Sequence, residues 1–353
     1  MASEERGSGM AEPRLPSPLT EVEDDRLARH GLRLLLKRDD LIHPELTGNK
    51  YRKLVPNLTA AREGGHRTLL TFGGAWSNHL RATATAGRLF GFRTIGVVRG
   101  DELAHRPLNP LLAEASAAGM ELHFVDRATY RRKTDPDVLA ALSDRHGPAY
   151  VLPEGGSNAL AAQGCAELGR EIGAAADVVA VACGTGGTLA GLAAGLPDSA
   201  QAIGFAVLRG GFLTDEVTRL QHAAFGGPRG HWRVEDRFHH GGYARRTPAL
   251  DAFAADFAAR HGLTPDPTYV AKLLYGLYAL AEERAFPPGT RIAAVITGRT
   301  GEPSQAGQVS SATEPAEPVE PPDFAEPPET FTTAEADGEP LTPSTSAPRN
   351  LVT

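Results

Sequence analysis

The chain has 353 residues, of which 41% are hydrophobic, and a net charge of −7. This length suffices for two domains, or for one large α/β domain, with a sizeable core. No basic tract indicates a nucleic-acid partner, no apolar run has the length of a transmembrane helix, and the polar N-terminus lacks the apolar segment of a signal peptide. The two cysteines, Cys165 and Cys183, argue against a disulfide framework, so we expect a cytoplasmic protein.

Short apolar runs alternate with amphipathic segments along most of the chain. The predicted strands are 32–36, 68–72, 94–98, 121–125, 149–152, 177–182, 202–207 and 291–296. The predicted helices are 51–64, 78–90, 110–118, 137–146, 159–172, 189–195, 248–261 and 269–283. This alternation is typical of an α/β fold with parallel sheets flanked by helices.

We predict two domains and a tail. Residues 51–156 form a small α/β domain, and residues 13–50 together with 157–300 form a larger one. A ligand then lies between the domains, at the carboxyl ends of the strands. Residues 301–353 contain ten acidic residues, ten prolines and one arginine, so they bury too little apolar surface to offset the entropy of ordering. We predict that this acidic, proline-rich C-terminal tail is disordered.

Two lysines stand close together after the first predicted strand, in the run Thr47–Leu54. Lys50 and Lys53 are three residues apart at the expected start of a helix, and therefore on one face of it. Pro56 fits this helix only within its first turn. The positive end of the helix dipole disfavours an ammonium group, and a neutral lysine amine can form a Schiff base with an aldehyde. The same place is a natural phosphate site.

An aldehyde and a phosphate on one cofactor describe pyridoxal 5′-phosphate (PLP). The chain has five lysines against thirty-one arginines, and two of the five stand within one helical turn, which favours a chemical role. A solvated basic face at a helix start would show the same pattern. On this run alone the two interpretations are about equally good.

Glycine-rich turns follow three of the predicted strands. Gly184-Thr185-Gly186-Gly187-Thr188 offers backbone N–H groups and hydroxyls that suit a phosphate. A second turn ends in Ser77, Asn78 and His79, where Ser77 or Asn78 is either an N-cap or part of a site. No second ligand at helical spacing supports a metal at His79. The run 155–158 repeats the pattern, and we interpret it as a hinge or a cap.

Three further residues stand near segment ends in the second half of the chain. Tyr243 lies in a glycine-rich loop, Tyr269 precedes a predicted helix, and Thr297 ends the last predicted strand. Taken one at a time, the tyrosines are more typical of packing and the threonine of an ordinary strand end.

Taken together, these segments resemble the fold-type II PLP-dependent enzymes, which have a tryptophan synthase β-like fold. The nearest resemblance, over about residues 14–300, is to the 1-aminocyclopropane-1-carboxylate (ACC) deaminase / D-cysteine desulfhydrase family. Its most specific part is Arg38-Asp39-Asp40-Leu41 followed by Gly48-Asn49-Lys50-Tyr51-Arg52-Lys53-Leu54, which is similar to the family's Schiff-base region. The Ser-Asn-His run, the 184–188 turn, the two tyrosines and Thr297 match the family as well.

The resemblance implies PLP as cofactor, bound by the larger domain, a small amino acid as substrate, and a homodimer. It implies these roles: covalent attachment of PLP and catalysis by Lys50; phosphate binding by Lys53, Gly184, Thr185, Gly186, Gly187 and Thr188; contacts to the PLP ring by Asn78 and Thr297; substrate binding by Ser77, Asn78 and His79; and catalysis by Ser77, Tyr243 and Tyr269.

One departure bears on the reaction. The deaminase branch carries a glutamate directly after the second tyrosine, and here that position is Val270. A threonine at position 297, as in the desulfhydrase branch, leaves the ring nitrogen largely neutral, which favours elimination of a β-substituent. We therefore expect D-cysteine desulfhydrase-like β-elimination to a 2-oxo acid and ammonia. Ring-opening deamination of ACC is the alternative, and a non-catalytic PLP- or amino-acid-binding protein is the alternative from another class.

Overall fold

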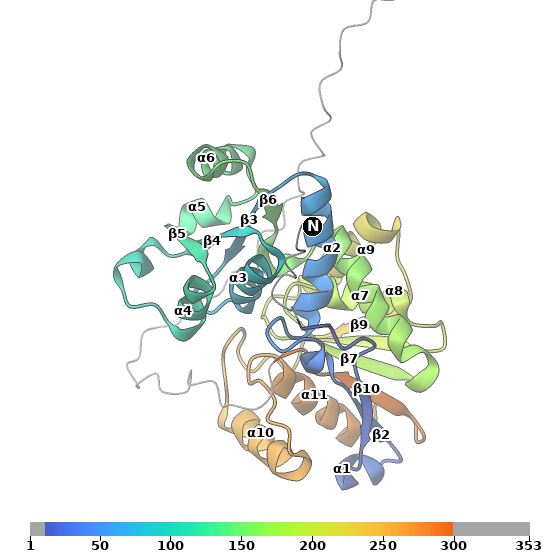
Figure 1. Ribbon diagram of the computed structural model, residues 1–353. Helices are drawn as coiled ribbons and strands as arrows, with labels where there is room; N and C mark the ends of the chain where they lie inside the picture. Colours follow the sequence, from blue (N-terminus) through green and yellow to red (C-terminus); the bar gives the residue numbers. More distant parts are fainter. Residues whose placement is uncertain (1–10, 299–353) are drawn as a thin grey trace, which may run out of the picture.

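The computed structural model describes residues 11–298, which form two mainly parallel sheets flanked by helices (Figure 1). The strands are β1 (Leu19–Val22), β2 (Arg33–Lys37), β3 (Thr68–Gly73), β4 (Arg93–Arg99), β5 (Met120–Val125), β6 (Tyr150–Leu152), β7 (Val178–Cys183), β8 (Gln201–Ala206), β9 (His231–Glu235) and β10 (Arg291–Val295). The helices are α1 (Asp25–Ala28), α2 (Asn49–Glu63), α3 (Asn78–Phe90), α4 (Pro110–Ala117), α5 (Arg127–Arg131), α6 (Pro136–His146), α7 (Ala159–Ile172), α8 (Gly187–Gly195), α9 (Leu213–Phe225), α10 (Pro248–His261) and α11 (Val270–Glu282).

The larger sheet has six strands in the order β1-β2-β10-β7-β8-β9. All neighbours are parallel except β1, which pairs antiparallel with β2 at the edge. The even-numbered residues of β7 pack in a core with α10 and α11, and the odd-numbered residues pack in a second core with α7, α8 and α9. Helices therefore cover both faces, which explains why β7 is apolar throughout.

The smaller sheet has four parallel strands in the order β5-β4-β3-β6. Leu69 of β3 packs with α2 and α3 on one face, and Leu70 and Phe72 pack toward α5 and α6 on the other. Figure 1 shows α2 running between this sheet and the helices of the larger one.

All eight predicted strands and all eight predicted helices are present. Three helices, α3, α7 and α10, have the predicted ends. Strands β1 and β9 and helices α1, α5 and α9 were not predicted from the sequence. Strand β9 owes its conformation to parallel pairing with β8, a long-range contact that its mixed sequence His-Trp-Arg-Val-Glu does not announce. Helix α9 does carry apolar residues at helical spacing, at positions 213, 217 and 220.

The expectation for Pro56 was wrong, because it lies in the interior of α2 and not in its first turn. A proline there leaves the carbonyl of the residue four positions earlier, Arg52, without its helical partner. Helix α7 crosses at this point, and a Cβ atom on Gly164 would lie 2.2 Å from the Arg52 oxygen. Tertiary packing against α7 thus accommodates the proline.

The division of the chain at residues 50/51 and 156/157 stays a prediction. The larger sheet takes its strands from both sides of the small one, but α2, assigned above to the small domain, also packs closely on α7. The predicted tail, 301–353, lies outside the described residues. Within residues 11–298, no helix is long and apolar enough to cross a bilayer.

Candidate active site

The carbonyl oxygen of Gly155 accepts hydrogen bonds from both lysines of α2. Lys50 Nζ lies 3.3 Å from it and Lys53 Nζ lies 3.2 Å from it. Gly155 belongs to the turn after β6, so the lysines meet the carboxyl end of the smaller sheet. The predicted common face of Lys50 and Lys53 is confirmed.

The start of α2 lies against the end of β10 in the larger sheet. Gly48 precedes the helix with a φ of 69°, and a Cβ atom there would lie 1.7 Å from the carbonyl oxygen of Thr297. Only glycine combines this φ with so close an approach. Thr297 is thereby held beside the first turn of the lysine helix.

Lys50 is an amine that gives up its proton readily. Burial lowers its pKa well below the ordinary value, and the charge of Lys53 lowers it further. Burial also lowers the pKa of Lys53. Within residues 11–298 no carboxylate is bonded to either amine, so an anion is the natural third component of this site.

The glycine-rich turn after β7 closes around Lys53. Ser157 Oγ accepts from Lys53 Nζ at 2.8 Å and lies 2.6 Å from Thr185 Oγ1. A Cβ atom on Gly187 would lie 3.2 Å from Lys53 Nζ. Thr188, in the first turn of α8, accepts from Asn49 Nδ2 at 2.8 Å. An ammonium group, hydroxyls and the N-terminus of α8 therefore converge, as a phosphate requires.

Ser77 is the N-cap of α3, and its Oγ accepts from the Leu80 backbone N–H at 3.2 Å. The hydroxyl proton remains available for a ligand, so the capping role does not exclude the predicted catalytic one. Asn78 follows as the first residue of the helix and is partly exposed.

His79 is buried and neutral. Burial, followed by the charges of Lys50 and Lys53, lowers its pKa well below the ordinary value. The Thr71 hydroxyl donates to the carbonyl of Leu152 at 3.0 Å, so it accepts from His79 Nε2 at 2.8 Å. The other ring nitrogen, Nδ1, is then an unprotonated acceptor, and it has no partner among residues 11–298.

The two predicted tyrosines are in contact. Tyr269 donates its hydroxyl to that of Tyr243 at 3.4 Å, and Tyr243 donates to the carbonyl of Trp76 at 3.0 Å, one residue before Ser77. The Tyr269 ring also lies 3.5 Å from the Cβ position of Gly184. Burial raises the pKa of both phenols, that of Tyr269 strongly, so both keep their protons at neutral pH. Both phenols therefore lie between the turn that precedes Ser77 and the 184–188 turn.

Comparison with known proteins agrees with this arrangement. A family model described as "Pyridoxal-phosphate dependent enzyme" matches residues 12–298. The chain belongs to the pyridoxal-phosphate-dependent enzymes. The resemblance inferred from the sequence is confirmed, and PLP is the cofactor of this family.

Relatives and solved structures narrow the comparison. The enzyme is 32% identical over 285 residues to a bifunctional D-cysteine desulfhydrase/ACC deaminase of Arabidopsis thaliana, covering 74% of this chain and 71% of that one. It is 33% identical over 307 residues to a D-cysteine desulfhydrase of Klebsiella pneumoniae, covering 80% and 91%. A crystal structure of an ACC deaminase homologue superimposes with a TM-score of 0.70 at 27% identity, covering 82% and 91%.

The residues of this PLP-dependent enzyme fit its cofactor. Lys50 supplies a neutral amine for the aldehyde, and Lys53 with the hydroxyl and N–H groups of the 184–188 turn supplies a cradle for the phosphate. Thr297 and Asn78 remain the predicted ring contacts, and the individual roles of all these residues stay predictions.

Several residues of the site were not recognised from the sequence. The run 155–158, interpreted as a hinge or cap, supplies Gly155 and Ser157 to the lysines, although Asn158 does cap α7. The signal was present, because this run shares the strand, glycine turn and helix start of the other two. Two further residues hold the tyrosine segments: Lys272 donates to the carbonyl of Gly242, directly before Tyr243, and Asp266 accepts from the backbone N–H of Tyr269. Neither carried a local signal in the sequence.

Proposed function

We propose that this enzyme is a lyase that removes the β-substituent of a small amino acid, with D-cysteine as substrate and sulfide, a 2-oxo acid and ammonia as products. Relatives named for D-cysteine desulfhydration support this proposal. The observation that carries it is the residue after the second tyrosine, Val270, whose fully buried side chain packs in the core and offers no carboxylate. The carboxylate of the nearby Asp266 already accepts three backbone N–H groups at the start of α11, so it does not replace the missing glutamate.

PLP supplies the electron sink that stabilises a carbanion at the substrate Cα atom. Lys50, as a neutral amine, takes the α-proton, because the phenols hold their own protons too firmly to act as bases. The bond from Cβ to sulfur then breaks, and the sulfur leaves as hydrosulfide, to which the phenol pair offers a neutral hydrogen-bond donor. Ser77, Asn78 and His79 bind the substrate carboxylate at the start of α3. The released enamine hydrolyses to pyruvate and ammonia.

The test is to measure sulfide, pyruvate and ammonia from D-cysteine, and 2-oxobutanoate and ammonia from ACC, with the purified holoenzyme. We expect the D-cysteine products, and a loss of at least about 10²-fold in kcat/KM on Lys50→Ala. Release of 2-oxobutanoate from ACC without sulfide from D-cysteine would instead support the deaminase function, which other relatives are named for. Sedimentation of the same preparation tests the homodimer, and fractionation of cells tests the cytoplasmic location, both of which belong to this proposal.

A further inference from the structure

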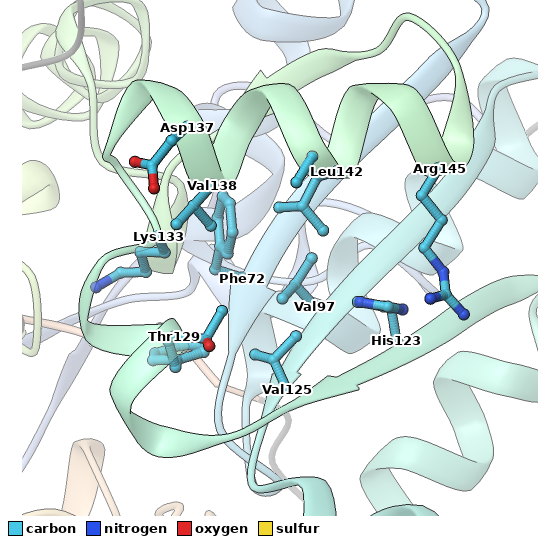
Figure 2. A pocket seen from close by; sticks show the side chains of 12 residues that line it. Phe72, Val97, His123, Val125, Thr129, Lys133, Asp137, Val138, Leu142 and Arg145 are labelled. Atoms are coloured by element: carbon cyan, nitrogen blue, oxygen red, sulfur yellow. The ribbon is translucent and has the colours of Figure 1, made fainter.

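A cavity of about 290 Å³ lies away from the lysines, between the smaller sheet and α6. Figure 2 shows α6 above it and the strands below, with the side chains of both directed into the gap. Its walls are mainly apolar: Phe72, Val97, Val125, Val138 and Leu142. Of the residues of α6, only Leu142 and His146 are buried, and Val138 and Leu139 pack only partly against the core of the smaller sheet. Asp137, Ala141 and Arg145 are exposed, so the cavity opens to solvent along α6.

Charged side chains stand around the rim of this cavity, and not all of them have an ion-pair partner among the described residues. Lys133 pairs with Glu154 at 3.5 Å, and its ammonium group points out of the cavity in Figure 2. Asp137 accepts from the guanidinium of Arg132 at 2.6 Å. Arg145, at the opposite end beside His123, makes no ion pair or hydrogen bond within residues 11–298. Arg145 is exposed and lines the rim of the apolar space, so its guanidinium is available to the anionic group of a ligand.

We propose that this cavity is a second binding site, distinct from the catalytic cleft, for a small apolar monocarboxylate. The carboxylate pairs with the Arg145 guanidinium, and an aromatic or branched aliphatic body lies between α6 and the sheet. At about 30 Å³ for a water-sized group, the volume holds a body of roughly ten such groups. The size and the mainly apolar wall agree with the smaller ligand pockets of proteins.

The site is separate from the PLP site but adjoins it. Phe72 contributes to the cavity from the face of β3, whereas the catalytic turn leaves the end of that strand. On the other side, Lys133 lines the cavity and pairs with Glu154, which directly precedes the lysine acceptor Gly155. Binding of a ligand in this cavity can therefore be measured directly, without an assay of the catalytic activity.

The probe is 3-phenylpropanoate, compared with its neutral isostere 3-phenylpropanamide, titrated into the full-length holoenzyme in a calorimeter. We expect the acid to bind with a submillimolar Kd and the amide at least about tenfold more weakly. Arg145→Gln should weaken binding of the acid by about the same factor. Arg67→Gln removes an exposed arginine of the same domain outside the cavity and should change nothing. Ala141→Trp places a bulky side chain at an exposed position on α6 that lines the cavity, and should abolish binding.

Two results would overturn the proposal. One is the absence of binding by the acid up to about 10 mM, at least about tenfold weaker than the submillimolar affinity expected. The other is binding that survives Ala141→Trp, or that D-cysteine displaces, because the acid would then occupy the catalytic cleft. The fold of each variant is checked by its thermal unfolding, so that loss of binding is not mistaken for loss of structure.

Discussion

The ammonium group of Lys272 donates to the carbonyl oxygen of Gly242 at 2.6 Å, inside the protein and with no exposed side-chain surface. Lys272 lies one turn after Tyr269 in α11, and Gly242 directly precedes Tyr243. The contact therefore joins the helix of one phenol to the loop of the other. That loop has unusual backbone conformations, with φ of 117° at Gly242 and 54° at Ala244, so it needs external support.

We predict that Lys272→Met lowers kcat by about 10–100-fold while the protein stays folded, because Tyr243 loses its fixed position relative to Tyr269. Lys272→Met keeps a side chain of similar length but leaves the Gly242 carbonyl without its donor, which costs about 1–3 kcal/mol of stability. The measurements are kcat, KM and the thermal midpoint. A midpoint lowered in proportion to the lost activity would indicate a merely structural role, and Lys272→Arg, which keeps a cationic donor, should recover part of kcat.

Stability should also depend on pH through Lys272. Burial lowers its pKa to about 8 from the ordinary value of 10.5, while the charge of Asp266 acts in the opposite direction. The unfolded chain therefore binds more protons between these two values, and this residue makes the free energy of unfolding rise with pH in that window. We expect the wild type to gain roughly 1–3 kcal/mol relative to Lys272→Met between pH 7.5 and 10.5. Denaturant titrations of both proteins measure this, and parallel curves would exclude it. His240, whose pKa is lowered by burial and by Lys272, titrates below the window.

Any side chain at position 48 should destabilise the protein for two reasons: the positive φ of Gly48 and the close approach of the Thr297 carbonyl. Gly48→Ala places a Cβ atom 1.7 Å from the Thr297 carbonyl oxygen, whereas a Cβ atom on Gly65 meets nothing within 4 Å. The φ values are similar, 69° and 72°, so Gly65→Ala is a matched control for backbone strain alone. We expect Gly65→Ala to cost about 1 kcal/mol of unfolding free energy. Gly48→Ala should cost at least about 3 kcal/mol and weaken PLP binding. Equal losses would show that the contact with Thr297 relaxes easily.

The charge of Lys53 should tune the reactivity of Lys50. Since that charge lowers the pKa of Lys50, Lys53→Met should raise this pKa and slow the reaction of Lys50 with an aldehyde at pH 7. Pyridoxal, which lacks the phosphate, separates this effect from phosphate binding. Its rate of attachment to the apoprotein, followed by absorbance against pH, should show a midpoint shifted to higher pH in the variant. An unchanged midpoint would mean that burial alone determines the pKa of Lys50.

Ser157 should contribute to holding the cofactor phosphate. Ser157→Ala removes the acceptor of Lys53 and the neighbour of Thr185, so we expect the Kd for PLP to rise by about 10–100-fold, the value of one hydrogen bond to a charged group. Equilibrium titration of the apoprotein with PLP measures this. Ser143→Ala, at an exposed position on α6, is the control and should leave the Kd unchanged. Normal affinity in Ser157→Ala would limit Ser157 to a turn residue.

Local patterns in the sequence determined much of this protein. The alternation of strands and helices predicted both sheets, and three-residue spacing predicted that Lys50 and Lys53 share a face, because the period of a helix is a local property. The glycine-rich turns were recognisable for the same reason. Pro56 was misjudged, since its tolerance depends on the crossing of α7 at Gly164 and not on α2 itself.

Only the tertiary structure decided which distant groups meet. Ser157 reaches Lys53 across 104 residues, and Lys272 reaches Gly242 across 30, contacts that neither composition nor periodicity encodes. The depressed pKa of Lys50 likewise comes chiefly from burial, which depends on the whole packed cleft and not on the helix start alone. Identity and spacing set which chemistry is available, and burial together with long-range contacts sets which charges and protons each side chain keeps.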